Sequence, residues 1–178
     1  MKITRTNFEK LLILETEKIT DIRGSFLKIF NQENFIKNNI DFKIKEYYHS
    51  ISRKDVIRGM HFQLPPYSHD KLIHVLNGSI VDVVVDLRKS SKTFKKIFEI
   101  QIDKPGVCLF IPEGFAHGFK SLENNTVVQY FVSSEYNPEM DTGINYGSLD
   151  YNWNVIKPIV SKRDSGFISL DELNTFFK

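Results

Sequence analysis

The chain has few of the features that mark disulfide-rich, membrane or nucleic-acid-binding proteins. Its 178 residues include one cysteine, Cys108, so no disulfide can form within the chain. Cys108 lies in an apolar run and is expected to be buried as a small apolar side chain. No apolar run reaches the length of a membrane span, and residues Met1 to Arg5 do not begin a signal peptide. We therefore expect a cytoplasmic protein without a membrane partner.

Neither sign of charge is in large excess. The 24 basic and 22 acidic side chains give a formal net charge of +2, which gives no reason to expect a nucleic acid partner. A local cluster of arginine and lysine could still bind a phosphate group. The length and the 41% content of apolar residues suit a single domain over residues 1–178.

Aromatic residues, in contrast, are abundant. Fifteen phenylalanines and seven tyrosines, together with valine and isoleucine, favour sheet over helix. Strand-like runs recur roughly every ten residues with turn residues between them, which is typical of a sandwich or barrel. Asn77-Gly78 predicts a type I′ hairpin turn between two of these runs. The expected strands cover residues 11–15, 26–30, 42–52, 72–76, 80–87, 98–102, 107–112, 115–121 and 126–133.

Two short helices are expected outside the strands. Asn31 can cap a helix that runs to about Lys37. Ser169 and Glu172 have the spacing of a capping box, which predicts a C-terminal helix at about residues 169–177.

The motif from Pro112 to His117, Pro-x-Gly-x-x-His, is half of the signature of the cupin fold. Metal-binding cupins usually add a His-x-His pair, but here Phe62 separates His61 from Gln63. They also carry a glutamate seven residues before a glycine, and here that position is Lys71. An ammonium group would repel a divalent cation, and two imidazoles are too few ligands for a catalytic metal. We therefore expect a cupin barrel without a metal.

From Arg23 to about Asp164 the chain resembles the dTDP-4-dehydrorhamnose 3,5-epimerase family, cupins without a metal that epimerise nucleotide-linked 4-keto sugars. The resemblance implies an all-β cupin jelly-roll barrel with short peripheral helices and an isomerase that needs no cofactor. It also implies a homodimer that serves the biosynthesis of surface polysaccharides such as capsule or lipopolysaccharide. The motifs that carry it are Arg23-Gly24, RGMHFQLPP from Arg58, Lys71-Leu72, GSIVDVVVDLR from Gly78, IPEGFAHGF from Ile111, Tyr130, Glu135–Pro138 and Ser161–Asp164.

The resemblance also implies roles for four catalytic residues. His61 would be the base, and Asp164 would pair with it to fix its tautomer and stabilise the imidazolium. Lys71 would stabilise the enolate oxygen at C4 of the sugar. Tyr130 would be the acid that returns a proton to the opposite face of the ring. Taken singly, each of these residues could be an ordinary structural or surface residue; their combination at the family spacing indicates a site.

Further residues are assigned to substrate binding by the same resemblance. Arg23 and Arg58 would contact the diphosphate, Arg23 across a dimer interface, and His117 and Tyr136 would line the pocket. Outside the motifs, we interpret Lys162-Arg163 as a solvated basic surface and expect His74 to face outward.

Three positions depart from the family pattern and affect the expected substrate. Lys28 stands where relatives that act on thymidine sugars usually have a glutamate, which makes a base with other acceptors, such as guanine, plausible. Glu46 and Tyr48 replace a glutamine and an asparagine, which indicates a differently decorated sugar. The substrate could therefore be a dTDP- or GDP-linked hexose or heptose, epimerised at C3 only or at C3 and C5. The alternatives are a 3,4-ketoisomerase of the same fold, a non-catalytic sugar-nucleotide-binding cupin, or a metal cupin.

Overall fold

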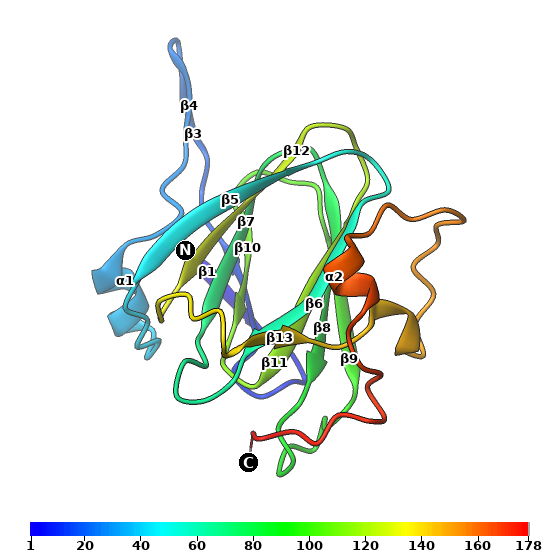
Figure 1. The fold of residues 1–178 in the computed structure, drawn as a ribbon. Coiled ribbons are helices and arrows are strands. Elements are labelled where there is room, and N and C mark those ends of the chain that lie inside the picture. Colours follow the sequence, from blue (N-terminus) through cyan, green and yellow to red (C-terminus); the bar gives the residue numbers. More distant parts are fainter. Residues whose placement is uncertain (178) are drawn as a thin grey trace.

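The strand segments form two antiparallel sheets that enclose the interior of a barrel (Figure 1), as described for residues 1–177 by a computed structural model. The first sheet has six strands and the second has five. In order across the first sheet, the strands are β1 (Lys2–Arg5), β2 (Leu12–Glu15), β10 (Val107–Ile111), β7 (Lys71–Asn77), β12 (Thr126–Val132) and β5 (Glu46–Ser52). Across the second sheet they are β13 (Asp141–Gly143), β6 (Ile57–Gln63), β11 (Phe115–Ser121), β8 (Ile80–Asp86) and β9 (Ile97–Ile102).

The main core lies between the two sheets. Alternate residues of each strand point inward, so that Ile73 and Val75 of β7 face Val84 of β8 across one apolar cluster. The outer face of the five-stranded sheet is covered by the segment after β13, and the outer face of the six-stranded sheet is covered by the segment that contains Phe35 and Phe42. The expected all-β cupin barrel is confirmed, and Cys108 is buried as predicted. No helix among residues 1–177 is long and apolar enough to cross a membrane.

Short peripheral elements complete the fold. The helix α1 (Gln32–Lys37) is capped by Asn31, whose side chain accepts a hydrogen bond from the Asn34 amide at 3.0 Å, as predicted. A second helix, α2 (Lys162–Ser165), lies beside β6, and a 3₁₀ turn, η1, covers Tyr146–Ser148. A hairpin of β3 (Ile19–Asp21) and β4 (Gly24–Phe26) stands away from the barrel (Figure 1), and it replaces the strand expected at residues 26–30.

The predicted hairpin at Asn77-Gly78 is wrong. The strands on either side of this pair, β7 and β8, lie in different sheets, and each already has partners on both edges. Gly78 has a positive φ of 79°, but Asn77 does not, so the pair is not a type I′ turn. Gly78 remains necessary because a Cβ there would lie 2.5 Å from Oγ1 of Thr126. The pair therefore leads the chain from one sheet to the other.

The predicted C-terminal helix at residues 169–177 is also wrong. Ser169 and Glu172 do form capping-box hydrogen bonds, with the Ser169 amide 3.1 Å from a Glu172 carboxylate oxygen, but no helix follows. The segment instead runs along the end of the barrel, where Thr175 Oγ1 donates to the Leu87 carbonyl at 2.7 Å. Hydrogen bonds to the barrel have replaced those within a helix.

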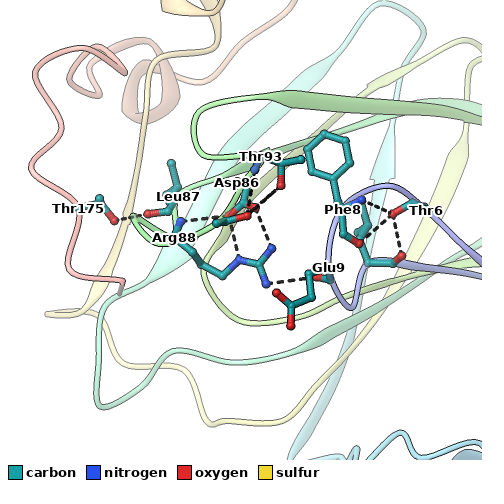
Figure 2. Close-up of polar contacts among 10 residues, drawn as sticks. Thr6, Phe8, Glu9, Asp86, Leu87, Arg88, Thr93 and Thr175 are labelled. Carbon is teal, nitrogen blue, oxygen red and sulfur yellow. Dashed lines mark hydrogen bonds and ion pairs between the residues drawn. The ribbon is translucent and has the colours of Figure 1, made fainter.

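A buried charge network fastens this end of the barrel (Figure 2). The Asp86 carboxylate is fully buried and accepts hydrogen bonds from Nε and Nη2 of Arg88 at 2.9 and 2.7 Å. It also accepts from Oγ1 of Thr93 at 2.7 Å. The Arg88 guanidinium lies 4.4 Å from the centre of the Phe115 ring and donates to the Glu9 carbonyl at 3.2 Å. The network thus joins the N-terminal loop to the β8–β9 connection.

We expect Asp86→Ala to lower the free energy of unfolding by about 3 kcal/mol, because it leaves a largely buried guanidinium without its anion. Urea denaturation followed by fluorescence would measure the loss. The control is Lys2→Ala, which removes an exposed ion pair with Glu15 and should change stability by less than about 0.5 kcal/mol. Equal effects of the two variants would show that the network does not stabilise the fold.

Candidate active site

Two adjoining cavities open inside the barrel, and Tyr48, His61 and Lys71 line both. The inner cavity, about 180 Å³, is also lined by Arg58, His117 and Tyr130. The outer cavity, about 340 Å³, is also lined by Glu46, His69, Tyr136, Asp141 and Arg163. The structure therefore brings most of the residues expected in the site to one place.

The two sheets supply different residues to the inner cavity. His61 lies on β6 and His117 on β11, both in the five-stranded sheet, and they are directly opposite each other in the strand pairing. Lys71 and Tyr130 lie on β7 and β12 of the six-stranded sheet. A molecule in the cavity would therefore have imidazole groups on one side and a phenol and an ammonium group on the other.

The His61 imidazole is held by Asp164, which stands on α2. Nε2 of His61 lies 3.0 Å from Oδ1 of Asp164, and the Gly59 amide donates to Oδ2 at 3.0 Å. Burial by itself would raise the pKa of the Asp164 carboxyl, but the hydrogen bonds from His61 and Gly59 outweigh it and lower that pKa. Because the carboxylate is ionised, Nε2 of His61 carries the proton and Nδ1 is left as an acceptor.

Lys71 is an ammonium group buried between the sheets. Its Nζ donates to the His61 carbonyl at 3.1 Å. Burial lowers the pKa of Lys71 to about 8, while the negative charges of Asp141 and Asp82 oppose the shift. The group is therefore still mostly charged at neutral pH, and it faces both cavities as a donor.

Tyr130 presents a protonated phenol to the inner cavity. Its hydroxyl lies 3.5 Å from Oγ of Ser50, and its ring is stacked on Tyr48 with centroids 4.8 Å apart and an angle of 16° between the rings. Burial raises the pKa of Tyr130 well above its usual value. The hydroxyl can therefore donate a proton at neutral pH but does not act as a ready base.

A second imidazole–carboxylate pair lies on the five-stranded sheet, the sheet that also carries His61. Nε2 of His117 is 2.9 Å from Oδ2 of Asp82, and both side chains are buried. Burial lowers the pKa of His117 and raises the pKa of Asp82, and each partner opposes the shift of the other. The His117 ring meets the edge of the Tyr130 ring at a centroid distance of 6.2 Å.

Some of the other residues expected to bind substrate line the cavities, and two of them, Arg23 and Lys28, do not. Arg58 lines the inner cavity, with Nε donating to Oγ of Ser52 at 3.0 Å. Glu46 and Tyr136 line the outer cavity, where a Glu46 oxygen accepts from the Tyr136 amide at 2.9 Å. Arg23 and Lys28 lie elsewhere: Arg23 is paired with Asp21 on the β3–β4 hairpin at 2.5 Å, and Lys28 lines a separate depression near α1.

Among residues 1–177, no three His, Cys, Asp or Glu side chains are grouped as metal ligands.

The sequence reasoning missed three charged residues of the site, Asp82, Asp141 and Arg163. Asp82 could have been found, because it is a charged residue at an inward position of an apolar strand. Arg163 does not belong to a solvated basic surface as interpreted, since its guanidinium pairs with Asp141 at 2.5 Å and lines the outer cavity. His74 faces away from the barrel interior, as its alternation with Ile73 and Val75 predicts, but it is buried, with Nδ1 2.8 Å from the Gln129 amide oxygen.

The barrel of two antiparallel sheets, with imidazole, phenol and ammonium groups around a cavity inside it, is that of a cupin. The family model described as dTDP-4-dehydrorhamnose 3,5-epimerase matches residues 5–172, and the chain belongs to this family. It is therefore an epimerase that acts on nucleotide-linked 4-keto sugars, in agreement with the resemblance that the motifs indicate.

Individual relatives support the same assignment along the whole chain. The dTDP-4-dehydrorhamnose 3,5-epimerase of Methanothermobacter thermautotrophicus is 36% identical over 177 residues, which is 96% of this chain and 95% of the relative. The crystal structure of the Bacillus anthracis enzyme with TDP and pyrophosphate bound has a TM-score of 0.91 and 35% identity, covering 95% of this chain and 99% of that one. The Legionella pneumophila enzyme in complex with dTDP-4-keto-L-rhamnose has a TM-score of 0.91 and 29% identity, covering 97% and 94% of the two chains.

The lowered pKa of Asp164 predicts a pH-dependent contribution to stability. A carboxyl with a depressed pKa in the folded state stabilises the fold above its unfolded pKa of about 3.9, and this contribution is lost as the pH falls toward the folded pKa. The difference in unfolding free energy between the wild type and Asp164→Asn should therefore shrink as the pH falls below about 4. Asp150→Asn, at an exposed carboxylate, is the control and should give a difference near zero throughout. A difference for Asp164→Asn that does not vary with pH would contradict the prediction.

Proposed function

We propose that this enzyme inverts C3, or C3 and C5, of a nucleoside-diphosphate-linked 4-keto sugar by removing and returning protons through an enolate. The observation that carries this proposal is that His61 and Tyr130 reach one cavity from facing sheets. Inversion of a carbon centre needs a base on one face of the ring and an acid on the other, which is the arrangement of these two side chains.

The steps follow from the residues around the cavity. The C4 ketone acidifies the adjacent C–H bond, and Nδ1 of His61 takes that proton while Asp164 stabilises the resulting imidazolium. The electron pair of the broken bond moves to the C4 oxygen, where the Lys71 ammonium stabilises the negative charge. The Tyr130 hydroxyl then donates its proton to the same carbon from the opposite face, and the ketone forms again. Water exchanges protons with His61 and Tyr130 and restores their starting states.

The nucleotide part of the substrate is held by residues around and beyond the cavities. Arg58 contacts the diphosphate, for which a guanidinium is suited because it can donate to two phosphate oxygens at once. Arg23 contacts the diphosphate in the site of a second chain within a homodimer. Two features of the hairpin that carries Arg23 support this arrangement: it stands away from its own barrel (Figure 1), and it exposes Ile19, Ile22 and Phe26.

Two nucleotides are candidates, and each is favoured by an observation. The relatives with bound ligands hold TDP or a dTDP-linked sugar. Lys28, in contrast, can only donate hydrogen bonds, which favours a base rich in acceptors, such as guanine in a GDP-linked hexose or heptose. Glu46 and Tyr48, which line the outer cavity beside the sugar site, would contact the part of the sugar that differs between these substrates.

The acid and the base can be told apart by incubating the enzyme with dTDP- and GDP-linked 4-keto sugars in deuterium oxide and following the products by NMR. The wild type should incorporate deuterium and invert the carbon. His61→Asn should lose both activities by roughly a hundred- to ten-thousand-fold, because no base remains. Tyr130→Phe should still incorporate deuterium but should not invert the carbon, because His61 returns the proton to the face from which it came.

His49→Asn is the matched control, since His49 is exposed on β5, and it should behave as the wild type. Undiminished exchange in His61→Asn would refute the proposed base. A product with the carbonyl moved to C3 would identify a 3,4-ketoisomerase. Tight binding of the sugar nucleotides without any exchange would identify a non-catalytic binder.

Nucleotide preference can be tested by calorimetry with GDP and dTDP. If Lys28 contacts the base, Lys28→Glu should shift the ratio of the two dissociation constants toward dTDP by about tenfold, which corresponds to one charged hydrogen bond of about 1.4 kcal/mol. Lys92→Glu makes the same charge change on the exposed connection between β8 and β9 and should leave the ratio unchanged. An unchanged ratio in Lys28→Glu as well would show that Lys28 does not contact the base.

A further inference from the structure

We propose that Asp82 is a positioning residue of this site, which holds the His117 ring and supplies the buried negative charge that balances the Lys71 ammonium. This inference rests on the proposed function, in which Lys71 stabilises the enolate. Asp82 itself does not line either cavity, so it would act through its two neighbours.

The surroundings of Asp82 offer few hydrogen-bond donors that would stabilise a buried carboxylate. It is fully buried on β8, where its partners in the strand pairing are Phe119 and Ile100. Its single hydrogen bond among the described residues is the one to Nε2 of His117, and its other oxygen, Oδ1, is buried without a partner. An apolar side chain would be less costly at such a position, so a charge kept there indicates a task other than stability.

The imidazole and guanidinium groups around Lys71 carry no negative charge, so they cannot balance its ammonium. His61 and His117 face Lys71 from the five-stranded sheet, and His69 faces it from the loop before β7. The charge of Lys71 lowers the pKa of His69 and of His117, as expected when a cation lies nearby. Arg58 and Arg163 also line the cavities. His69 and His117 are therefore neutral, and the two guanidinium groups are positive, so the Lys71 ammonium needs carboxylates nearby to remain protonated.

Two of the nearby carboxylates oppose the loss of that proton, and they differ in how far they are already neutralised. Asp141 lies 2.5 Å from the Arg163 guanidinium, which offsets its charge. Among residues 1–177, Asp82 is hydrogen-bonded through its side chain only to His117, whose pKa is lowered by burial and which therefore remains neutral. Glu46, Tyr48, Tyr130 and Tyr136 complete the titratable groups that line the two cavities around the ammonium. Burial keeps the phenols of Tyr48 and Tyr130 in the neutral form. Burial raises the pKa of Asp82, but the hydrogen bond from His117 and the charge of Lys71 both oppose that rise. We therefore assign Asp82 as the buried anion paired in charge with Lys71.

The same contact determines which tautomer His117 adopts. An ionised Asp82 accepts a hydrogen bond, so Nε2 of His117 carries the proton and Nδ1 is an acceptor. His117 then adds no positive charge opposite Lys71, whose ammonium lies beside the position proposed for the C4 oxygen. Without the carboxylate, the ammonium would give up its proton at a lower pH, and the enolate would lose its stabilising cation.

The test is the pH dependence of deuterium exchange into the sugar nucleotide for the wild type and Asp82→Asn. The amide oxygen of asparagine can still accept the hydrogen bond from His117, so the change removes mainly the charge. We expect the alkaline limb of the rate profile to move to lower pH by about one unit, with KM changed less than about threefold. In a Lys71→Arg background the same substitution should leave the alkaline limb in place, because arginine does not lose its proton.

Asp86→Asn is the matched control, because Asp86 is equally buried on the same strand but is bound to Arg88, away from both cavities. It should lower the melting temperature without moving the alkaline limb. A folded Asp82→Asn variant whose profile coincides with that of the wild type would overturn the proposal.

A second measurement needs neither turnover nor the Asp82→Asn variant. The ¹³C resonance of Cε of Lys71, identified by its loss in Lys71→Arg, should titrate above neutral pH in the wild-type enzyme without substrate. If it titrates below neutral pH, Asp82 does not keep the ammonium charged, even if Asp82→Asn fails to fold. Because this titration needs no reaction, it also separates failure of the present inference from failure of the proposed function, which would appear as an absence of exchange in the wild type.

Discussion

The burial of one ammonium group, that of Lys71, is the constraint on which the rest of the site depends. A charge inside an apolar barrel requires acceptors for its hydrogen bonds and anions within reach. The His61 carbonyl, Asp82 and Asp141 meet these requirements, and they come from three strands of the five-stranded sheet, opposite the sheet that carries Lys71. The same charge stands at the position where the motif of metal-binding cupins has a carboxylate ligand, and in the mechanism we propose this side chain polarises the carbonyl.

The two buried carboxylates of β8 show how one strand serves both the fold and the site. Asp86 accepts hydrogen bonds from the Arg88 side chain and from the hydroxyls of Ser91 and Thr93, so its charge is well neutralised and it stabilises the end of the barrel (Figure 2). Asp82, four residues earlier, has one hydrogen bond and an oxygen without a partner. A buried carboxylate contributes most to stability when both of its oxygens accept hydrogen bonds. A carboxylate with an unpartnered oxygen is less stabilising, but its negative charge acts more strongly on neighbouring charged groups.

Local patterns in the sequence predict much of this structure, and the errors arise where distant segments decide the outcome. Asn31 caps a helix because its side chain bonds within four residues. Asn77-Gly78 has the local features of a hairpin, but the edges of β7 and β8 are already occupied by strands distant in the sequence. Arg163 looks like a surface residue because the partner that draws it into the site, Asp141, follows a stretch without strand periodicity. The motifs allow the fold and most residues of the cavity to be expected, whereas pairs of charged residues from short elements outside the regular strand pattern, such as Asp141 of β13 and Arg163 of α2, cannot be read from local spacing.

The placement of the site residues also separates the chemistry from the recognition of the nucleotide. His61, Lys71 and Tyr130 lie on central strands, whose positions are fixed by pairing on both edges. Arg23 and Lys28 lie on the β3–β4 hairpin and the segment that follows it, outside the barrel (Figure 1). Residues outside the barrel can change without disturbing the core, because they make few of its packing contacts. If the base is bound there, as we propose, a barrel with one acid–base arrangement can serve different nucleotides. Lys28 would then alter the choice of substrate and leave the proton transfers unchanged.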